Sequence, residues 1–197
     1  SFDYIYDYVK LPAFDAVRRD KHAFAEAFKN EYLEQDPIRG KRLAQQNGEW
    51  CVVANPPALP LTEAEMDEIY DLPYQRTYHP VYEAAGGVPA IQEVQFSLVS
   101  QRGCFGGCNF CAIISHEGRI IQRRSHASLL REAKLLTQLP GFKGYIHDVG
   151  GPTANFRRPS CDGQLERGTC RGKPCLSPVP CKNLVADHSD YIQLLRE

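Results

Sequence analysis

The chain has 197 residues, of which 43% are hydrophobic and 24% are charged, and its formal net charge at pH 7 is -1. These values are typical of a folded protein with one domain or one domain and an appendage, and they give no electrostatic reason to expect nucleic acid or an anionic membrane as a partner. No apolar run approaches the roughly 20 residues of a membrane helix, and the aromatic, acidic first ten residues do not resemble a secretory signal. We therefore expect a cytoplasmic protein without membrane contact and without a clear nucleic-acid signature.

The two ends of the chain suggest a piece of a longer protein. The first residue is serine rather than methionine, which indicates either processing or a fragment. The last eight residues, DYIQLLRE, place Tyr191, Leu194 and Leu195 at helical spacing with no stop signal after them. They predict the start of a helix.

Residues 1–49 predict an irregular segment followed by a helix. Asp20 is a candidate N-cap for a helix that continues to about Leu33. Its apolar stripe consists of Ala23, Phe24, Ala27 and Phe28. This spacing predicts a face packed on a core.

A short strand and a second helix are predicted next. Residues 50–54, WCVVA, predict a buried strand that ends at Asn-Pro-Pro, with Cys51 as a small buried hydrophobic residue rather than a ligand. Thr62 and Glu65 form a capping box for a helix that ends near Asp71. Up to residue 90 we find no catalytic motif.

A βαβ unit is predicted in the middle of the chain. Alternating residues over 94–99 predict a strand, residues 125–139 predict an amphipathic helix with a serine N-cap, and residues 144–149 predict a second strand. This order implies parallel strands and a right-handed crossover. The cysteine-containing loop after the first strand and the turn at Gly150-Gly151 then lie at carboxyl ends of neighbouring strands, where α/β folds place their active sites.

Seven of the eight cysteines lie between residues 104 and 181, which favours metal ligation over disulfides in a cytosolic chain. Three of them form a triplet within eight residues: Cys104, Cys108 and Cys111. Structural zinc usually takes four ligands in two pairs, whereas three close thiolates suit three corners of a cubane cluster and leave one iron open. The neighbouring glycines are Gly103, Gly106 and Gly107, which permit sharp bends and let amide groups approach the sulfides. The alternatives are a zinc site with a further ligand such as His116, and unligated thiols.

The loop 104–111, CFGGCNFC, resembles the signature of the radical S-adenosylmethionine (SAM) superfamily, including the aromatic Phe110 before the last cysteine. The resemblance implies that the triplet holds a [4Fe-4S] cluster, that SAM chelates its open iron, and that one electron cleaves SAM to methionine and a 5′-deoxyadenosyl radical. It places Phe110 near the adenine. It also places Gly150 and Gly151 in the element that contacts the SAM amino group, where Pro152 stands instead of the family's acidic residue.

Longer stretches resemble the YgiQ-type radical SAM proteins, namely residues 55–74, 148–156 and 181–197. These proteins have an N-terminal region ahead of the radical SAM domain and a C-terminal extension. The resemblance implies an α/β fold with an incomplete (βα) partial barrel, an N-terminal α+β subdomain and a Cys-rich loop segment. It also implies a reductant such as flavodoxin or ferredoxin, and it identifies no substrate.

The expected organisation has four parts. They are the end of an N-terminal region (1–90), the start of the radical SAM core (91–156), a Cys-rich insertion (157–186) and the start of the next helix (187–197). Only 86 residues follow Cys111, and a βαβ unit needs roughly 30, so the barrel is expected to be incomplete. We therefore expect this chain to hold a cluster, to bind SAM poorly and to turn over no substrate.

A second cysteine group lies in a segment rich in Arg, Gly and Pro that is too polar to form much of a core. Its members are Cys161, Cys170, Cys175 and Cys181. Zinc or a second iron–sulfur cluster would tie this segment down, but the spacings are not the common paired ones, so unligated thiols or disulfides stay open. His188 is a spare ligand whose surroundings favour a helix start.

Other polar residues near the predicted strand ends favour structural roles. For His147, solvent exposure or a structural hydrogen bond is expected rather than catalysis. Asp148 is better placed, two residues before the Gly-Gly turn, and both a structural hydrogen-bonding role and a functional role stay open for it. Arg119, Arg123 and Arg124 are expected to form a solvated basic surface, the alternative being contact with an anionic substrate or the SAM carboxylate.

Three functions are compatible with these observations. The leading one is a radical SAM enzyme. A non-catalytic zinc or iron–sulfur module and a radical SAM enzyme that modifies RNA or protein are the alternatives, the last by analogy only.

Overall fold

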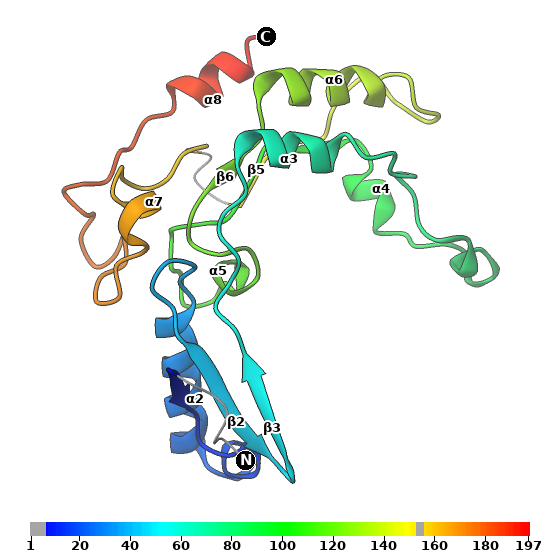
Figure 1. Cartoon of the computed structure of the whole chain (residues 1–197). Coiled ribbons are helices and arrows are strands. Elements are labelled where there is room, and N and C mark those ends of the chain that lie inside the picture. Colours follow the sequence, from blue (N-terminus) through cyan, green and yellow to red (C-terminus); the bar gives the residue numbers. More distant parts are fainter. Residues whose placement is uncertain (1–6, 153–155) are drawn as a thin grey trace. The chain divides into compact units, whose positions relative to one another are not determined.

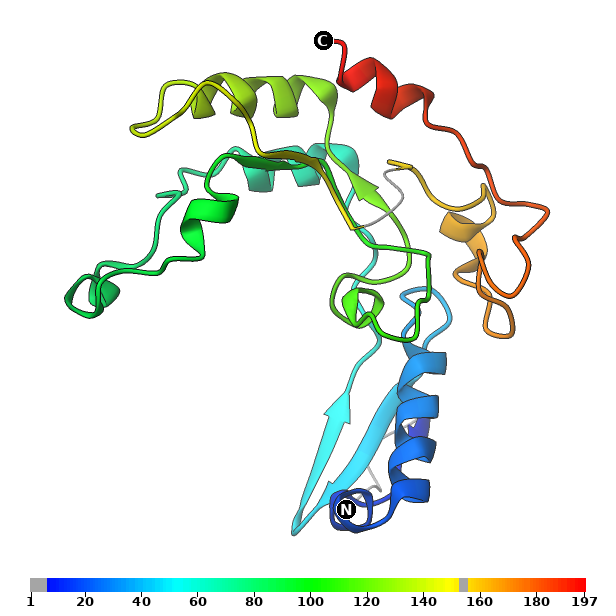
Figure 2. The same ribbon diagram turned by 180° about the vertical axis from the view of Figure 1, so that it is seen from behind.

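The computed structural model describes residues 7–152 and 156–197 (Figures 1 and 2). The chain divides into two compact units. Unit 1 consists of Ser1–Pro60, Cys104–Ile120 and Pro159–Val185, and unit 2 of Leu61–Gly103, Ile121–Arg158 and Ala186–Glu197. The predicted division into four sequential parts stays a prediction. The helices of the described residues are all too short or too polar to cross a membrane.

Unit 1 contains a three-stranded sheet with a helix beside it (Figure 1). The strands are β1 (Tyr8–Lys10), β2 (Arg42–Asn47) and β3 (Trp50–Ala54), in that order across the sheet. β1 pairs parallel to β2, and β3 pairs antiparallel to it through a tight turn with Gly48 at φ 57°. The helices are α1 (Phe14–Arg19), α2 (Lys21–Glu34), α5 (Ile113–Glu117) and α7 (Gln164–Arg167).

The predicted N-cap of α2 is confirmed, because the Asp20 side chain accepts a hydrogen bond from the His22 amide at 2.9 Å. The predicted buried stripe is wrong at two of its four positions. Ala27 is buried, whereas Phe24 and Phe28 are more than half exposed and stack on each other at 6.5 Å. A narrow sheet covers only part of a helix, so the rest of the apolar stripe stays at the surface.

The prediction of a buried strand at residues 50–54 is also wrong. β3 is a strand, but it pairs only with β2 among the described strands, and Trp50 is 80% exposed. Cys51 is half-buried. Trp and Val favour strands through their shape, so their presence here reflects strand propensity rather than burial.

Unit 2 contains the predicted βαβ unit. Its helices are α3 (Glu63–Tyr70), the 3₁₀ helix η1 (Pro80–Ala85), α4 (Ile91–Val94), α6 (His126–Leu136) and α8 (Ser189–Leu194). Its strands are β4 (Ser97–Val99), β5 (Gln101–Arg102), β6 (Gln122–Arg123) and β7 (Asp148–Gly150). β4 and β7 are parallel, with Leu98 opposite Val149, and α6 lies between them in the chain. Both strands are shorter than predicted, and the first begins late because α4 takes up residues 91–94.

The core of unit 2 lies where α6 and α8 meet the parallel strands. Its buried members are Phe96, Leu98, Leu129, Leu136 and Leu194. The Tyr191 hydroxyl donates to the Val149 carbonyl at 2.6 Å, which fastens α8 to β7. The predicted C-terminal helix is therefore confirmed, although Leu195 is exposed.

Local capping signals gave correct helix starts. The capping box of Thr62 and Glu65 has both of its hydrogen bonds, and the Ser125 side chain accepts from the Ser128 amide at the start of α6. The described residues form a mixed α/β structure with sheets of three, two and two strands, none of them closed. The partial barrel stays a prediction.

Candidate functional site

The cysteine triplet lies in unit 1, on the loop that precedes α5. The amide of Cys104 donates to the Gly118 carbonyl at 3.0 Å, which closes the loop at its base. The amide of Cys111 donates to the Cys108 carbonyl at 3.1 Å, so the last two cysteines lie on one tight turn.

The glycines of the loop bring backbone and sulfur together. The Gly106 amide donates to Cys104 Sγ at 3.3 Å. An ideal Cβ on Gly106 would lie 3.3 Å from Cys104 Sγ and 3.7 Å from Cys108 Sγ, so these two sulfurs flank the same small space. Gly103 and Gly107 have φ angles of 84° and 69°, which other residues rarely adopt. The predicted sharp bends are confirmed, and the approach of amide groups to cluster sulfides stays a prediction.

The three cysteines differ in exposure. Cys104 is buried, Cys111 is half-buried and Cys108 is exposed, so one side of the loop is open. Among the described residues, no three His, Cys, Asp or Glu side chains form a group that could hold a single metal ion. The cluster and the zinc site with His116 both stay predictions.

The residues that the resemblance assigns to SAM lie in two places. Phe110, beside the triplet in unit 1, is 92% exposed. Gly150 ends β7 in unit 2, and its carbonyl accepts from the Ser100 amide at 2.6 Å. An ideal Cβ on Gly151 would lie 2.4 Å from Gln101 Cγ and 2.7 Å from the Gln101 carbonyl, so only glycine fits there. Their role toward SAM stays a prediction.

Gln101 is a candidate site residue that the sequence analysis missed. It follows β4 at the carboxyl end of the strand and is fully buried. Neither the nitrogen nor the oxygen of its side-chain carboxamide has a hydrogen-bond partner among the described residues. Burying a carboxamide without partners costs free energy, which makes Gln101 a candidate for contact with a polar ligand. Its position two residues after the end of β4, on the way to the cysteines, was the available signal.

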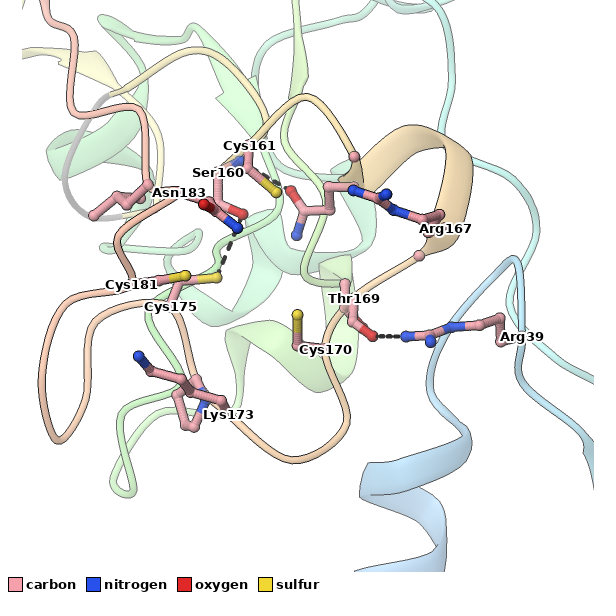
Figure 3. A pocket seen from close by; sticks show the side chains of 15 residues that line it. Arg39, Ser160, Cys161, Arg167, Thr169, Cys170, Lys173, Cys175, Cys181 and Asn183 are labelled. Carbon is pink, nitrogen blue, oxygen red and sulfur yellow. Dashed lines mark hydrogen bonds between the residues drawn. The ribbon is translucent and has the colours of Figure 1, made fainter.

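The second cysteine group lies in unit 1 and lines one cavity (Figure 3). The cavity has a volume of about 220 Å³ and contains all four predicted residues, Cys161, Cys170, Cys175 and Cys181. None of the four forms a disulfide in the structure. The Cys175 thiol lies 3.3 Å from Ser160 Oγ, to which it donates. His188 does not line the cavity; it stacks on Phe156 at 4.6 Å just before α8.

Hydrogen bonds fasten the Cys-rich segment to the turn that follows α2. The Thr169 amide and hydroxyl both donate to the buried Asp36 carboxylate, and the Arg39 guanidinium donates to the Thr169 carbonyl. Burial alone would raise the pKa of Asp36, but the hydrogen bonds from Thr169, Arg39 and Ile38 together lower it below its ordinary value. This polar segment is thus ordered by side-chain contacts within unit 1.

Two of the three arginines predicted at a solvated surface are buried instead. Arg119 is buried, donates to the Cys170 carbonyl at 3.2 Å and lies over the Tyr32 ring. Arg124 is fully buried, forms an ion pair with Glu132 and lies 4.1 Å from the centre of the Tyr70 ring. A guanidinium can be buried when carboxylate, carbonyl and ring partners surround it.

The remaining polar candidates are at the surface. Arg123 is partly exposed and pairs with Glu63. His147 and Asp148 are exposed at the start of β7, and the His147 ring stacks on Tyr145 at 4.9 Å.

Comparison with known proteins agrees with these features. The family described as "Radical SAM N-terminal" matches residues 3–97. A UPF0313 protein of Clostridium botulinum is 56% identical over 97% of this chain, and one of Clostridium perfringens is 54% identical over the whole chain. The chain spans 30% of the length of each of these relatives. No solved structure matches it. The chain therefore belongs to the radical SAM superfamily, among the YgiQ-type or UPF0313 proteins.

Proposed function

We propose that Cys104, Cys108 and Cys111 bind a [4Fe-4S] cluster and that the protein is a radical SAM enzyme. The observation that carries this proposal is the triplet loop itself, where two sulfurs flank Gly106 and one side is open. When bound, the cluster would supply the electron for the reductive cleavage of SAM to methionine and a 5′-deoxyadenosyl radical. The substrate is unassigned.

Residues around the triplet would support the cluster in distinct ways. The Gly106 amide, which already donates to Cys104 Sγ, would stabilise negative charge on that thiolate. The exposed side of the loop at Cys108 would leave room for SAM at an iron without a protein ligand. Phe110 offers an exposed ring on which an adenine could stack.

The end of the parallel strand pair would bind the polar part of SAM. Gln101 offers a carboxamide that can donate to a carboxylate and accept from an ammonium group. The close fit of Gly151 against Gln101 keeps that side chain in place. We further propose that the βαβ unit is the start of the superfamily's partial barrel, and that the protein is cytoplasmic and receives electrons from a flavodoxin or ferredoxin.

The cluster can be tested by metal analysis of the chain purified without oxygen and supplied with iron and sulfide. The triple variant Cys104→Ala, Cys108→Ala, Cys111→Ala is expected to bind about four irons fewer than the parent, because three-cysteine ligation of one cluster is lost. Cys51→Ala, which changes the half-buried cysteine of β3, should keep the parent's iron content. Equal iron in the triple variant and the parent would refute the proposal.

The role of Gln101 can be tested through the response of the cluster to SAM. Adding SAM should change the electron paramagnetic resonance spectrum of the reduced chain. Gln101→Leu is expected to raise the SAM concentration needed for this change by about tenfold or more, since a hydrogen bond to a charged group is lost. The control is Gln138→Leu, at an exposed position of the same unit. An unchanged SAM response in Gln101→Leu would show that this residue only packs.

A further inference from the structure

We infer that the cavity lined by the second cysteine group is a second cluster site, which binds four irons through Cys161, Cys170, Cys175 and Cys181. In Figure 3 the four sulfurs come from different stretches of the segment and point toward a common space. Four thiols that face one cavity provide the complete set of protein ligands for a cubane cluster. This site shares no ligand with the triplet.

The cavity has room for a group of several metal atoms, since its volume is about 220 Å³. Zinc would draw four sulfurs to about 2.3 Å around one atom, whereas a cubane cluster gives each of the four cysteines its own iron. Iron and sulfide content therefore separates a cluster from a single zinc ion.

The charge of the lining also suits a cluster. Arg39, Arg167 and Lys173 line the cavity, and none of the described residues in its wall is acidic. A cluster with four thiolates is an anion, and nearby cations stabilise both the thiolates and the cluster charge. Asn183 and Ser160 add polar groups that can donate hydrogen bonds to sulfur (Figure 3).

The wall of the cavity is held by contacts that do not involve the sulfurs. Asp36 binds the amide and hydroxyl of Thr169, and Arg119 binds the carbonyl of Cys170. The Gln164 side chain lines the cavity and donates to the Arg119 carbonyl at 3.1 Å. Backbone positions on both sides of Cys170 are thus fixed while its thiol stays available. Such a preformed frame lowers the cost of assembling the site.

The test uses the chain that lacks the triplet. The variant Cys104→Ala, Cys108→Ala, Cys111→Ala, supplied with iron and sulfide without oxygen, is expected to hold about four irons and about four sulfides, whose spectrum does not respond to SAM. Adding Cys161→Ser and Cys175→Ser to this variant should remove that iron. Adding Cys51→Ser instead should leave it in place.

The outcomes separate this inference from the proposed function. Suppose that the parent has a SAM-responsive cluster and that the variant without the triplet holds no iron. This result would overturn the second site and leave the first intact. About one zinc per chain without sulfide in the triplet variant, or a disulfide within the second group, would also overturn it. The inference is supported if the variant without the triplet keeps its iron and loses it when Cys161 and Cys175 are also changed. This holds even if the parent shows no response to SAM.

Discussion

Replacing Glu132 by glutamine is expected to lower the free energy of unfolding by about 3–5 kcal/mol, because it leaves a buried positive charge without its partner. The Glu132 carboxylate pairs with Arg124, which is fully buried, and with Arg76, which is mostly buried. Glutamine keeps the size of the side chain but not its charge. Arg124 would then face only neutral groups, among them the Val99 carbonyl and the Ser128 hydroxyl.

The same helix supplies a matched control. Arg131 of α6 pairs with Asp71 at 2.7 Å, but both side chains are about half exposed. Asp71→Asn is therefore expected to change the free energy of unfolding by at most about 1 kcal/mol. Urea unfolding followed by far-ultraviolet circular dichroism compares the two variants with the parent. If Glu132→Gln were as mild as Asp71→Asn, the buried ion pair would not be a main support of unit 2.

Local features of the fold could be predicted because they depend on residues a few positions apart. The N-caps Asp20 and Ser125 and the capping box at Thr62 each place an oxygen within reach of amides in the first helical turn. The parallel pairing of β4 and β7 followed from the order of elements, since a strand, a helix and a strand leave few other arrangements.

Burial could not be predicted with the same success, because it depends on what the rest of the chain places nearby. Phe24, Phe28 and Trp50 look like core residues, yet each is more than half exposed. Arg119 and Arg124 look like surface residues, yet both are buried by partners from distant parts of the sequence, such as the Cys170 carbonyl and Glu132. Spacing along the chain carries no information about such partners.

The site shows the same contrast. The short spacing of the triplet identified three candidate ligands directly. In the second group, gaps of up to eight residues gave only a weak signal, and the shared cavity emerged from the fold. Asp36 gave no signal at all, since its partner Thr169 lies 133 residues later in the chain.

That contact leads to the second large expected effect. Asp36→Asn is expected to lower the free energy of unfolding at pH 7 by about 2–4 kcal/mol, because charge-assisted hydrogen bonds are lost. In addition, the side-chain NH₂ group of asparagine would face a hydrogen-bond donor. The Asp36 carboxylate is 2% exposed and accepts four hydrogen bonds, from the amides of Ile38, Arg39 and Thr169 and from the Thr169 hydroxyl. Asparagine has one oxygen to accept them, and its nitrogen would compete with the remaining donors.

The pH dependence of this effect has a definite sign. Hydrogen bonds from Thr169, Arg39 and Ile38 outweigh burial and hold the pKa of Asp36 below its ordinary value. The charged form therefore stabilises the fold fully above the unfolded pKa of about 3.9, and this contribution is lost as pH falls through the lower pKa of the folded state. The difference between parent and Asp36→Asn should thus be largest near pH 7 and shrink in acid.

Urea unfolding at pH 7 and near pH 3 measures this difference, and hydrogen exchange at pH 7 localises it. In Asp36→Asn the amides of Arg39 and Thr169 should exchange faster, because both donate to the carboxylate. Asp20→Asn is the control, since asparagine caps a helix about as well as aspartate. A loss of stability that is independent of pH would indicate that the shape of the side chain, not its charge, holds the Cys-rich segment in place.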